Sequence, residues 1–131
     1  MKIDITPSGI VINEQTFKLP CLTGMMIRAL GRPSRIDEKN FSQIITWDDL
    51  GIYLNSKNGN MIDAFNLLLV QGEEYTFPFL PETVFTGEYT IEGQPYKDRR
   101  IDKHELVGTY GIYNWIGVKE EIIYSASIVA M

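Results

Sequence analysis

The segment Asp102-Lys103-His104-Glu105 gathers the side chains best suited to chemistry in this chain. An imidazole flanked by carboxylates has the groups needed for general acid/base catalysis or for a metal site. His104 is the single histidine, so a metal site would need further ligands from elsewhere in the fold. We expect a polar surface loop here. The alternative is a small enzyme that uses Asp102, His104 and Glu105.

Two other features invite a catalytic interpretation. Asp48 and Asp49 form an acidic pair, but adjacent residues of a strand point to opposite faces, so we expect Asp48 or Asp49 to hydrogen-bond turn amides ahead of Gly51. Cys21 is the single cysteine, which excludes an internal disulfide. Its apolar surroundings indicate a buried structural thiol rather than a nucleophile with His104 as base. We therefore expect no catalytic residue, no metal and no cofactor.

Charge and hydropathy exclude several kinds of partner. The 131 residues carry a formal net charge of -5, which argues against binding to nucleic acid because phosphate recognition requires a basic surface. No apolar stretch approaches the about 18 residues of a membrane span. Asp4 and Pro7 interrupt the N-terminal apolar residues, so no secretory signal is expected. These observations favour a cytoplasmic protein.

The acidic excess is confined to one half of the chain. Residues 1–70 carry seven cations and seven anions, whereas residues 71–131 carry five cations, ten anions and ten of the fifteen aromatic residues. Aromatic residues with acidic neighbours suit capture of a basic protein, because the rings provide contact area and the carboxylates steer association. A solvated sheet face is the simpler alternative. The residues expected to bind a partner are Glu73, Glu74, Glu88, Tyr89, Glu92, Asp48 and Asp49.

One helix is predicted, over residues 23–30. Leu22, Met26 and Leu30 repeat at the helical period and would share one face. Thr23 is expected to cap the first turn, and Gly31 to take the left-handed position after the last one.

Alternation of apolar and polar residues predicts strands over the rest of the chain. Residues 10–12 and 16–19 form an expected hairpin, and residues 43–47 and 52–54 another. Residues 61–70 are interpreted as a central strand, with a helix as the alternative. In the last strand, from Ile122 to Ala130, the even-numbered residues are expected on one face, and Ser125 and Ser127 on the other. The predicted fold is a single α+β domain over residues 1–131, mainly an antiparallel sheet of hairpins with one short helix packed on it.

Three motifs are distinctive in combination: residues 30–35 (LGRPSR), 47–53 (WDDLGIY) and 85–93 (FTGEYTIEG). They resemble a group of small bacterial domains in which a helix ends in a Leu-Gly-x-Pro turn, a hairpin follows and a Phe-x-Gly strand closes the sheet. A looser similarity links the helix and strands to the β-lactamase-inhibitor-like fold and to small outer-membrane-assembly lipoproteins, which act by binding proteins. The resemblance implies an immunity protein, a class that blocks a co-encoded toxin.

We therefore predict a non-enzymatic protein-binding domain, specifically an immunity protein that occludes a secreted bacterial toxin. A structural subunit that forms homo-oligomers through its aromatic strands is the further alternative.

Overall fold

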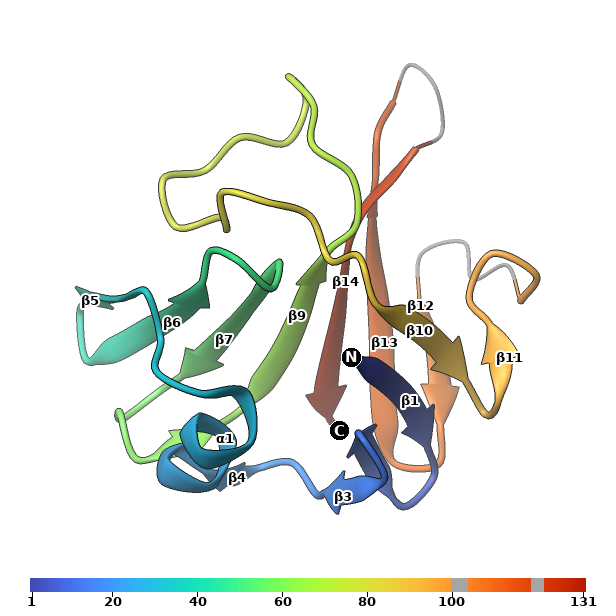
Figure 1. Ribbon diagram of the computed structural model, residues 1–131, viewed down its shortest axis with the longest axis horizontal. Coiled ribbons are helices and arrows are strands. Elements are labelled where there is room, and N and C mark those ends of the chain that lie inside the picture. The colour runs from blue at the N-terminus through green and yellow to red at the C-terminus, as the bar shows by residue number, and fades with distance from the viewer. Residues whose placement is uncertain (100–103, 119–121) are drawn as a thin grey trace.

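Strands are the predominant regular structure and form two large sheets and one small one (Figure 1). The computed structural model describes residues 1–99, 104–118 and 122–131. One sheet has seven strands in the order β12-β13-β14-β9-β7-β6-β5. They are β5 (Arg35–Lys39), β6 (Ser42–Trp47), β7 (Ile52–Ser56), β9 (Ala64–Leu68), β12 (His104–Val107), β13 (Tyr110–Ile116) and β14 (Ile123–Ala130).

The second sheet has five strands in the order β11-β10-β1-β2-β3. Its strands are β1 (Lys2–Thr6), β2 (Gly9–Ile12), β3 (Gln15–Phe17), β10 (Glu88–Ile91) and β11 (Gln94–Pro95). A short pair, β4 (Cys21–Leu22) with β8 (Met61–Ile62), completes the strands. The fold is therefore mainly antiparallel β-sheet with one short helix, which is mostly β with a small α contribution.

The two predicted hairpins are present. β2 pairs with β3, and β6 pairs with β7 across the turn that contains Asp48 and Asp49. Residues 61–70 form no helix, as interpreted, but the expected single strand is divided in two. β8 pairs with β4, and only β9 is central in the large sheet, between β14 and β7.

Three pairings depart from the expected series of hairpins: β4 with β8, β9 with β14, and β1 with β10. The first two are antiparallel, and the third is not. β1 and β10 run parallel, with Ile3 beside Tyr89 and Ile5 beside Ile91. The two strands are far apart in sequence, and local patterning carries no information about such a contact.

The helix α1 (Thr23–Leu30) has the predicted bounds. Gly31 follows it and donates its N–H to the Ile27 carbonyl. Its φ of +91° is positive, as expected, but its ψ of −171° lies outside the left-handed helical region. The predicted cap is wrong: the Thr23 hydroxyl donates to the Gly59 carbonyl at 3.0 Å and ties the helix to the turn before β8. Leu22 is also exposed rather than buried with the rest of the helix face.

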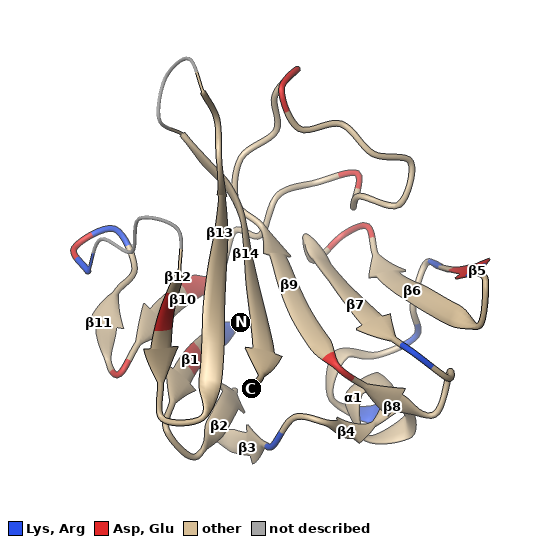
Figure 2. Cartoon of the chain, turned by 180° about the vertical axis from the view of Figure 1, so that it is seen from behind, with Lys and Arg blue, Asp and Glu red and all other residues tan. Residues whose placement is uncertain are grey.

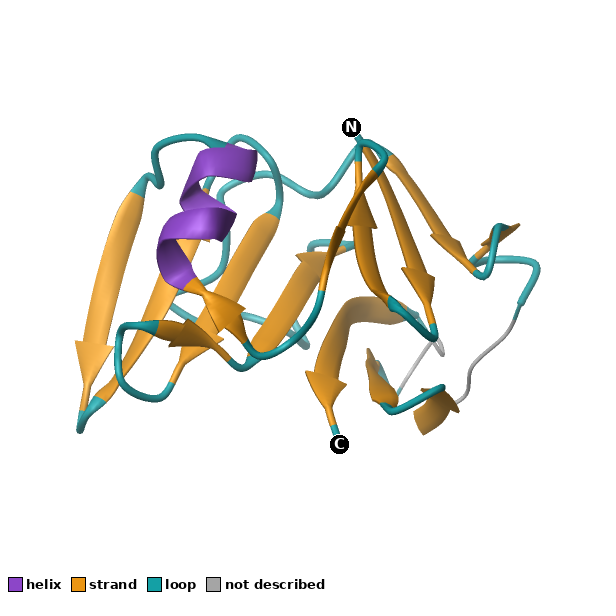
Figure 3. Cartoon of the chain, turned by 90° about the horizontal axis from the view of Figure 1, so that it is seen from below, coloured by secondary structure: helices purple, strands orange, loops and turns teal. Residues whose placement is uncertain are grey.

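The main core lies on one side of the seven-stranded sheet. Figure 3 shows α1 and the five-stranded sheet both on this side. One cluster of buried side chains joins all three elements, including Met26 from α1, Ile5 from β1, and Leu54 and Phe65 from the seven-stranded sheet. The opposite side, which we call the rear face, is covered only in part.

A smaller cluster lies on the rear face, where the 69–87 loop between β9 and β10 packs against the sheet. It contains Ile44, Tyr53 and Leu68 from the sheet and Tyr75 from the loop, together with Tyr124. The presence of Tyr124 corrects the predicted alternation in β14. Trp115 pairs with Ser125 and Ile116 with Ile123, so Tyr124 is the extra residue of a β-bulge. The bulge places Tyr124 in the rear cluster, away from Ala126 and Ile128 in the main core.

Within the described part of the chain, no helix has the length and apolar character needed to cross a membrane.

Cys21 offers a test of the main core. It is 7% exposed, and burial raises the pKa of its thiol from the ordinary 9.0 to about 11. The raised pKa contributes stability below pH 9 that is lost as the pH rises toward 11. We expect the native thiol to react with a disulfide reagent at pH 8 about 100-fold more slowly than in denaturant, because the thiolate is scarce and covered.

The matched control moves the thiol by one position, with Cys21→Ala and Leu22→Cys combined, since Leu22 is 54% exposed. That variant should react at close to the denatured rate, as followed by absorbance of the released reagent. Equal rates for the two native proteins would contradict the placement of Cys21.

Candidate functional site

The rear face of the seven-stranded sheet is uncharged except at its edge strand β5, where Arg35, Asp37 and Lys39 lie opposite Thr46, Ile44 and Ser42 of β6. β13, β14, β9, β7 and β6 are neighbours in the sheet and contain no Asp, Glu, Lys or Arg. Figure 2 looks onto this side, with β13, β14 and β9 crossing the centre without blue or red. A solvated face of an antiparallel sheet ordinarily carries charged residues, so this composition sets the face apart.

A continuous group of rings lies on this face. His104 of β12 stacks on Tyr113 of β13 with centroids 4.5 Å apart, and Trp115 follows on the same side of β13. Trp115 contacts Tyr75 of the loop at 5.4 Å. The ring centroid of Phe77 lies 5.1 Å from that of Tyr75. Phe79 lies 5.3 Å beyond Phe77. We call Tyr75, Phe77, Phe79, His104, Tyr113 and Trp115 the aromatic face.

Much of the aromatic face is open to solvent. Trp115 is 52% exposed, Phe77 42% and Tyr113 38%. Leu106 and Met131 are exposed near Tyr113, whose hydroxyl donates to the Met131 sulfur. Tyrosine, tryptophan, phenylalanine and methionine are the residues enriched at protein interfaces, and charged residues are depleted from interface cores. The composition of this face is therefore that of an interface core.

The 69–87 loop, which supplies three of the six rings, is held by side chains of β5 and β6. The Thr46 hydroxyl donates to the Phe79 carbonyl at 3.0 Å. The Arg35 guanidinium donates to the Leu80 carbonyl at 2.6 Å. Because the carbonyls of Phe79 and Leu80 are both bonded, this part of the loop is fixed relative to the sheet.

Asp48 holds the next part of the loop. Its carboxylate accepts the Glu82 N–H at 3.1 Å and pairs with Arg35 at 3.3 Å. Its carbonyl accepts the Thr83 hydroxyl at 2.6 Å. The turn after β6 is thus an anchor for the loop. Asp48 or Asp49 was expected to bond amides of its own turn; Asp48 bonds instead to a segment more than thirty residues away.

A chain of buried hydroxyls holds Tyr75 from below. The Tyr53 hydroxyl lies 2.8 Å from the Tyr75 hydroxyl and 2.7 Å from the Ser125 hydroxyl. Burial raises the pKa of Tyr53, so it stays protonated and takes part in both hydrogen bonds at neutral pH. The β-bulge at Tyr124 is what turns this end of β14 toward the rear cluster. The aromatic face consequently rests on a rigid polar support.

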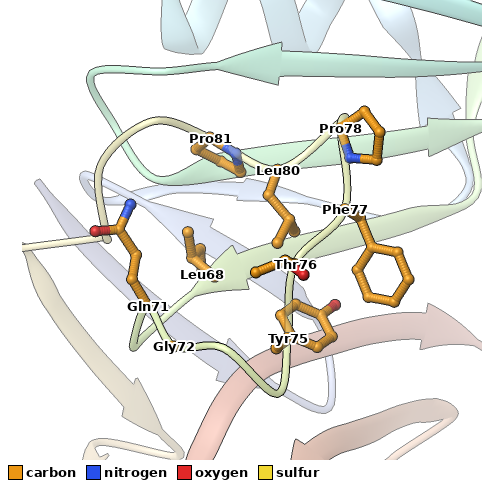
Figure 4. Close-up of a pocket in the computed structure, with 9 residues that line it drawn as sticks. All are labelled: Leu68, Gln71, Gly72, Tyr75, Thr76, Phe77, Pro78, Leu80 and Pro81. Carbon is orange, nitrogen blue, oxygen red and sulfur yellow. The ribbon is translucent and has the colours of Figure 1, made fainter.

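A pocket of about 490 Å³ opens between the two limbs of the loop. Figure 4 shows Leu68, Leu80 and Thr76 between Gln71 at one end and Phe77 at the other. Tyr75 and Phe77 belong both to this pocket and to the aromatic face. The pocket is therefore a recess at the edge of that face.

The charges around the pocket are acidic. Glu73, Glu74 and Glu82 are exposed on the loop, and no Lys or Arg occurs between Lys57 and Lys97. Glu74 accepts a hydrogen bond from Tyr124 at 3.3 Å. Among the described residues, Glu73 and Glu82 have no ion-pair partner. Lys39 lies over the Phe79 ring at the far end of the aromatic face.

The seven residues expected to bind a partner do not gather in one place. Glu73 and Glu74 lie on the 69–87 loop, whereas Glu88, Tyr89 and Glu92 lie on or just after β10 in the other sheet. Asp48 and Asp49 occupy the turn between β6 and β7. In Figure 2 the acidic segments of the loop are correspondingly separate from those beside β10.

Four of the seven have other contacts, including Glu74, which accepts the hydrogen bond from Tyr124. Tyr89 is 5% exposed and its ring stacks on Tyr96, so its side chain faces the core. Glu92 pairs with Arg99 at 3.1 Å. Asp48 is occupied by the loop. Glu73, Glu74, Asp49 and Glu88 remain exposed, of which the first two border the aromatic face.

The segment considered for catalysis is only partly described, since Asp102 lies outside the described residues. His104 is exposed and stacked on Tyr113, while Glu105 accepts a hydrogen bond from Arg99 at 2.7 Å. Cys21 lies in the main core. The described residues hold no cluster of three His, Cys, Asp or Glu placed to bind a metal.

The sequence contained a signal for the aromatic face that composition alone did not show. Tyr113 and Trp115 alternate along β13 and lie opposite Ser127 and Ser125 of β14. Large rings paired with small polar residues on one strand face indicate a surface that is neither core nor ordinary solvated sheet. Finding it from sequence requires the pairing register.

The chain belongs to the family described as Domain of unknown function (DUF7738), whose model matches residues 2–106. No curated protein and no solved structure matches the chain.

The loop anchor gives a prediction from neighbouring residues. Asp48→Ala should lower the free energy of unfolding by about 2 kcal/mol, because it removes the acceptor of the Glu82 N–H and one of the partners of the Arg35 guanidinium. Asp49→Ala should change it by less than about 0.5 kcal/mol, since that side chain is exposed. Urea denaturation measures both, and hydrogen exchange at the Glu82 amide should accelerate only in Asp48→Ala. Equal effects of the two substitutions would remove Asp48 as the anchor.

Removing the hydroxyl of each of two buried tyrosines should change the free energy of unfolding in opposite directions. Tyr53→Phe breaks two hydrogen bonds and should lower the free energy of unfolding by about 2 kcal/mol. The Tyr89 hydroxyl is buried without a hydrogen-bond partner among the described residues, so Tyr89→Phe should raise stability by about 1 kcal/mol. Denaturant titrations of both variants against the parent protein provide the comparison. Destabilisation by Tyr89→Phe would show that its hydroxyl is bonded.

Proposed function

We propose that this chain is a protein-binding domain whose contact surface is the aromatic face. The observation that carries the proposal is a row of exposed rings on an uncharged sheet face, held in place by hydrogen bonds to the 69–87 loop. Exposed apolar patches of this kind mark interaction sites, and tryptophan and tyrosine dominate binding energy where they occur. A loop that is already ordered loses little conformational entropy when it binds.

Glu73 and Glu82, which we call the acidic rim, favour a basic partner. Glu73 and Glu82 carry charges that no described residue neutralises, and they flank the segment that supplies Tyr75, Phe77 and Phe79. Carboxylates at the edge of an interface accelerate association with a cationic surface and exclude acidic ones. Glu88 and Glu92, on the other sheet, are not required by this arrangement.

The specific form of the proposal is an immunity protein that acts in the cytoplasm and occludes a secreted antibacterial toxin. The motif resemblance and the acidic rim support it. Occlusion requires no catalytic group, only a surface of about 800 Å² on each partner. Toxins that act on nucleic acid have basic clefts, which the acidic rim would complement.

The test requires the candidate toxin. We take as the probe the purified protein encoded by the gene next to the one for this chain. Trp115→Ala should weaken its binding by about tenfold or more in calorimetric titrations, because an interface tryptophan buries a large apolar area. Phe41→Ala is the matched control: Phe41 is 97% exposed in the turn between β5 and β6, outside the aromatic face, and its loss should leave binding within about twofold.

Charge reversal separates the two acidic groups. Glu73→Lys and Glu82→Lys should slow association at low salt, whereas Glu88→Lys should not. Failure of the probe to bind would contradict the immunity role. A self-associated dimer that Trp115→Ala dissociates, seen by size-exclusion with light scattering, would assign the face to homo-oligomer formation instead.

A further inference from the structure

We infer that the pocket at the edge of the aromatic face is the anchor site for one large aliphatic side chain of the partner, adjacent in its sequence to a lysine or arginine. This inference rests on the proposed function for the class of partner. It specifies what the site recognises: an aliphatic side chain that fills the pocket, and a neighbouring basic side chain that the acidic rim attracts.

The pocket has the lining for an apolar side chain and space for part of the neighbouring residue as well. Its volume of about 490 Å³ lies within the range of about 300–1,000 Å³ typical of ligand pockets. Leu68, Leu80, Pro78 and Pro81 supply aliphatic surface, and Phe77 closes one end (Figure 4). None of the lining side chains is charged. The site consequently has nothing to orient a strongly charged metabolite, whereas a leucine side chain would be buried against carbon on several sides.

The walls are already in position. Leu80 is held through its carbonyl by Arg35, and Tyr75 through its hydroxyl by Tyr53. At the other end the Gln71 amide donates to the Glu82 carbonyl at 2.6 Å and links the two limbs of the loop. A preformed recess beside exposed aromatic residues has the arrangement of an interface hot spot, where an anchor residue fills a pocket on the partner.

The acidic residues near the pocket favour a basic residue next to the anchor side chain. Glu73 and Glu82 are exposed on the same loop as the pocket lining. The cation closest to the pocket is Arg35, which donates to the Leu80 carbonyl and is paired with Asp37 and Asp48. A cationic residue next to the anchor is attracted, and an anionic one is repelled, by an interaction that salt screens.

Three capped dipeptides test the anchor and the charge separately: N-acetyl-Lys-Leu-methylamide, N-acetyl-Glu-Leu-methylamide and N-acetyl-Lys-Ser-methylamide. Each is titrated into methyl-labelled protein while the resonances of Leu68, Leu80 and Thr76 are followed. Leu106, exposed on β12, serves as the reference methyl. We expect saturable shifts at the pocket methyls with Lys-Leu, about tenfold weaker affinity for Lys-Ser, and about threefold weaker affinity for Glu-Leu at low salt.

Filling the recess provides the control variant. Thr76→Trp places a large ring in the pocket and should abolish the saturable shifts. Thr16→Trp, at an exposed threonine on β3, should leave them unchanged. If Thr76→Trp fails to fold, Leu80→Ala replaces it: the enlarged pocket should then prefer N-acetyl-Lys-Phe-methylamide to the leucine probe.

The inference is overturned if Lys-Ser shifts the pocket methyls as strongly as Lys-Leu, or if Leu106 responds as much as Leu68 and Leu80. Equal affinity for Lys-Leu and Glu-Leu removes the basic neighbour from it. The dipeptides require no protein partner, so their binding is independent of the Trp115 experiment. Loss of one result with retention of the other identifies which proposal has failed.

Discussion

Burial of one side of the seven-stranded sheet is the constraint on which the rest of the structure depends. The strands contribute Leu54, Phe65 and Ile128 to a core that needs a cover, and two elements of different kind supply it: α1 on one part and the five-stranded sheet on the other. The opposite face of such a sheet must be either covered by other elements or exposed to solvent. The rear face, with its partial cover, is the consequence.

The 69–87 loop resolves this requirement for only part of the rear face. It buries Tyr53 and Leu68 beneath Tyr75, and it is held from outside the loop by Thr46, Arg35 and Asp48. Beyond the loop, Tyr113 and Trp115 of β13 remain exposed. The same anchoring that stabilises the fold thus leaves a rigid, uncharged border between covered and open sheet, where the aromatic face and its pocket lie.

Features with a local cause were predictable. The helix followed from the spacing of Met26 and Leu30 and from Gly31 after it, and β9 followed from its apolar run. The cap at Thr23 failed because a tertiary hydrogen bond to Gly59 takes its hydroxyl. Asp48 was recognised as a turn residue, but its acceptor atoms serve the Glu82 and Thr83 segment, which sequence spacing does not bring near.

By itself, the sequence determined that strands predominate, that one helix lies in the N-terminal half and that the acidic excess belongs to residues 71–131. Periodicity and composition are properties of neighbouring residues, so they can be read along the chain. Only the tertiary structure decided which acids and rings share a surface. Glu88 and Glu92 lie on or next to β10 in the other sheet, Tyr89 is buried in the core, and Tyr75 of the loop contacts Trp115. These outcomes depend on long-range strand pairing and on one β-bulge, and neither leaves a periodic trace in the sequence.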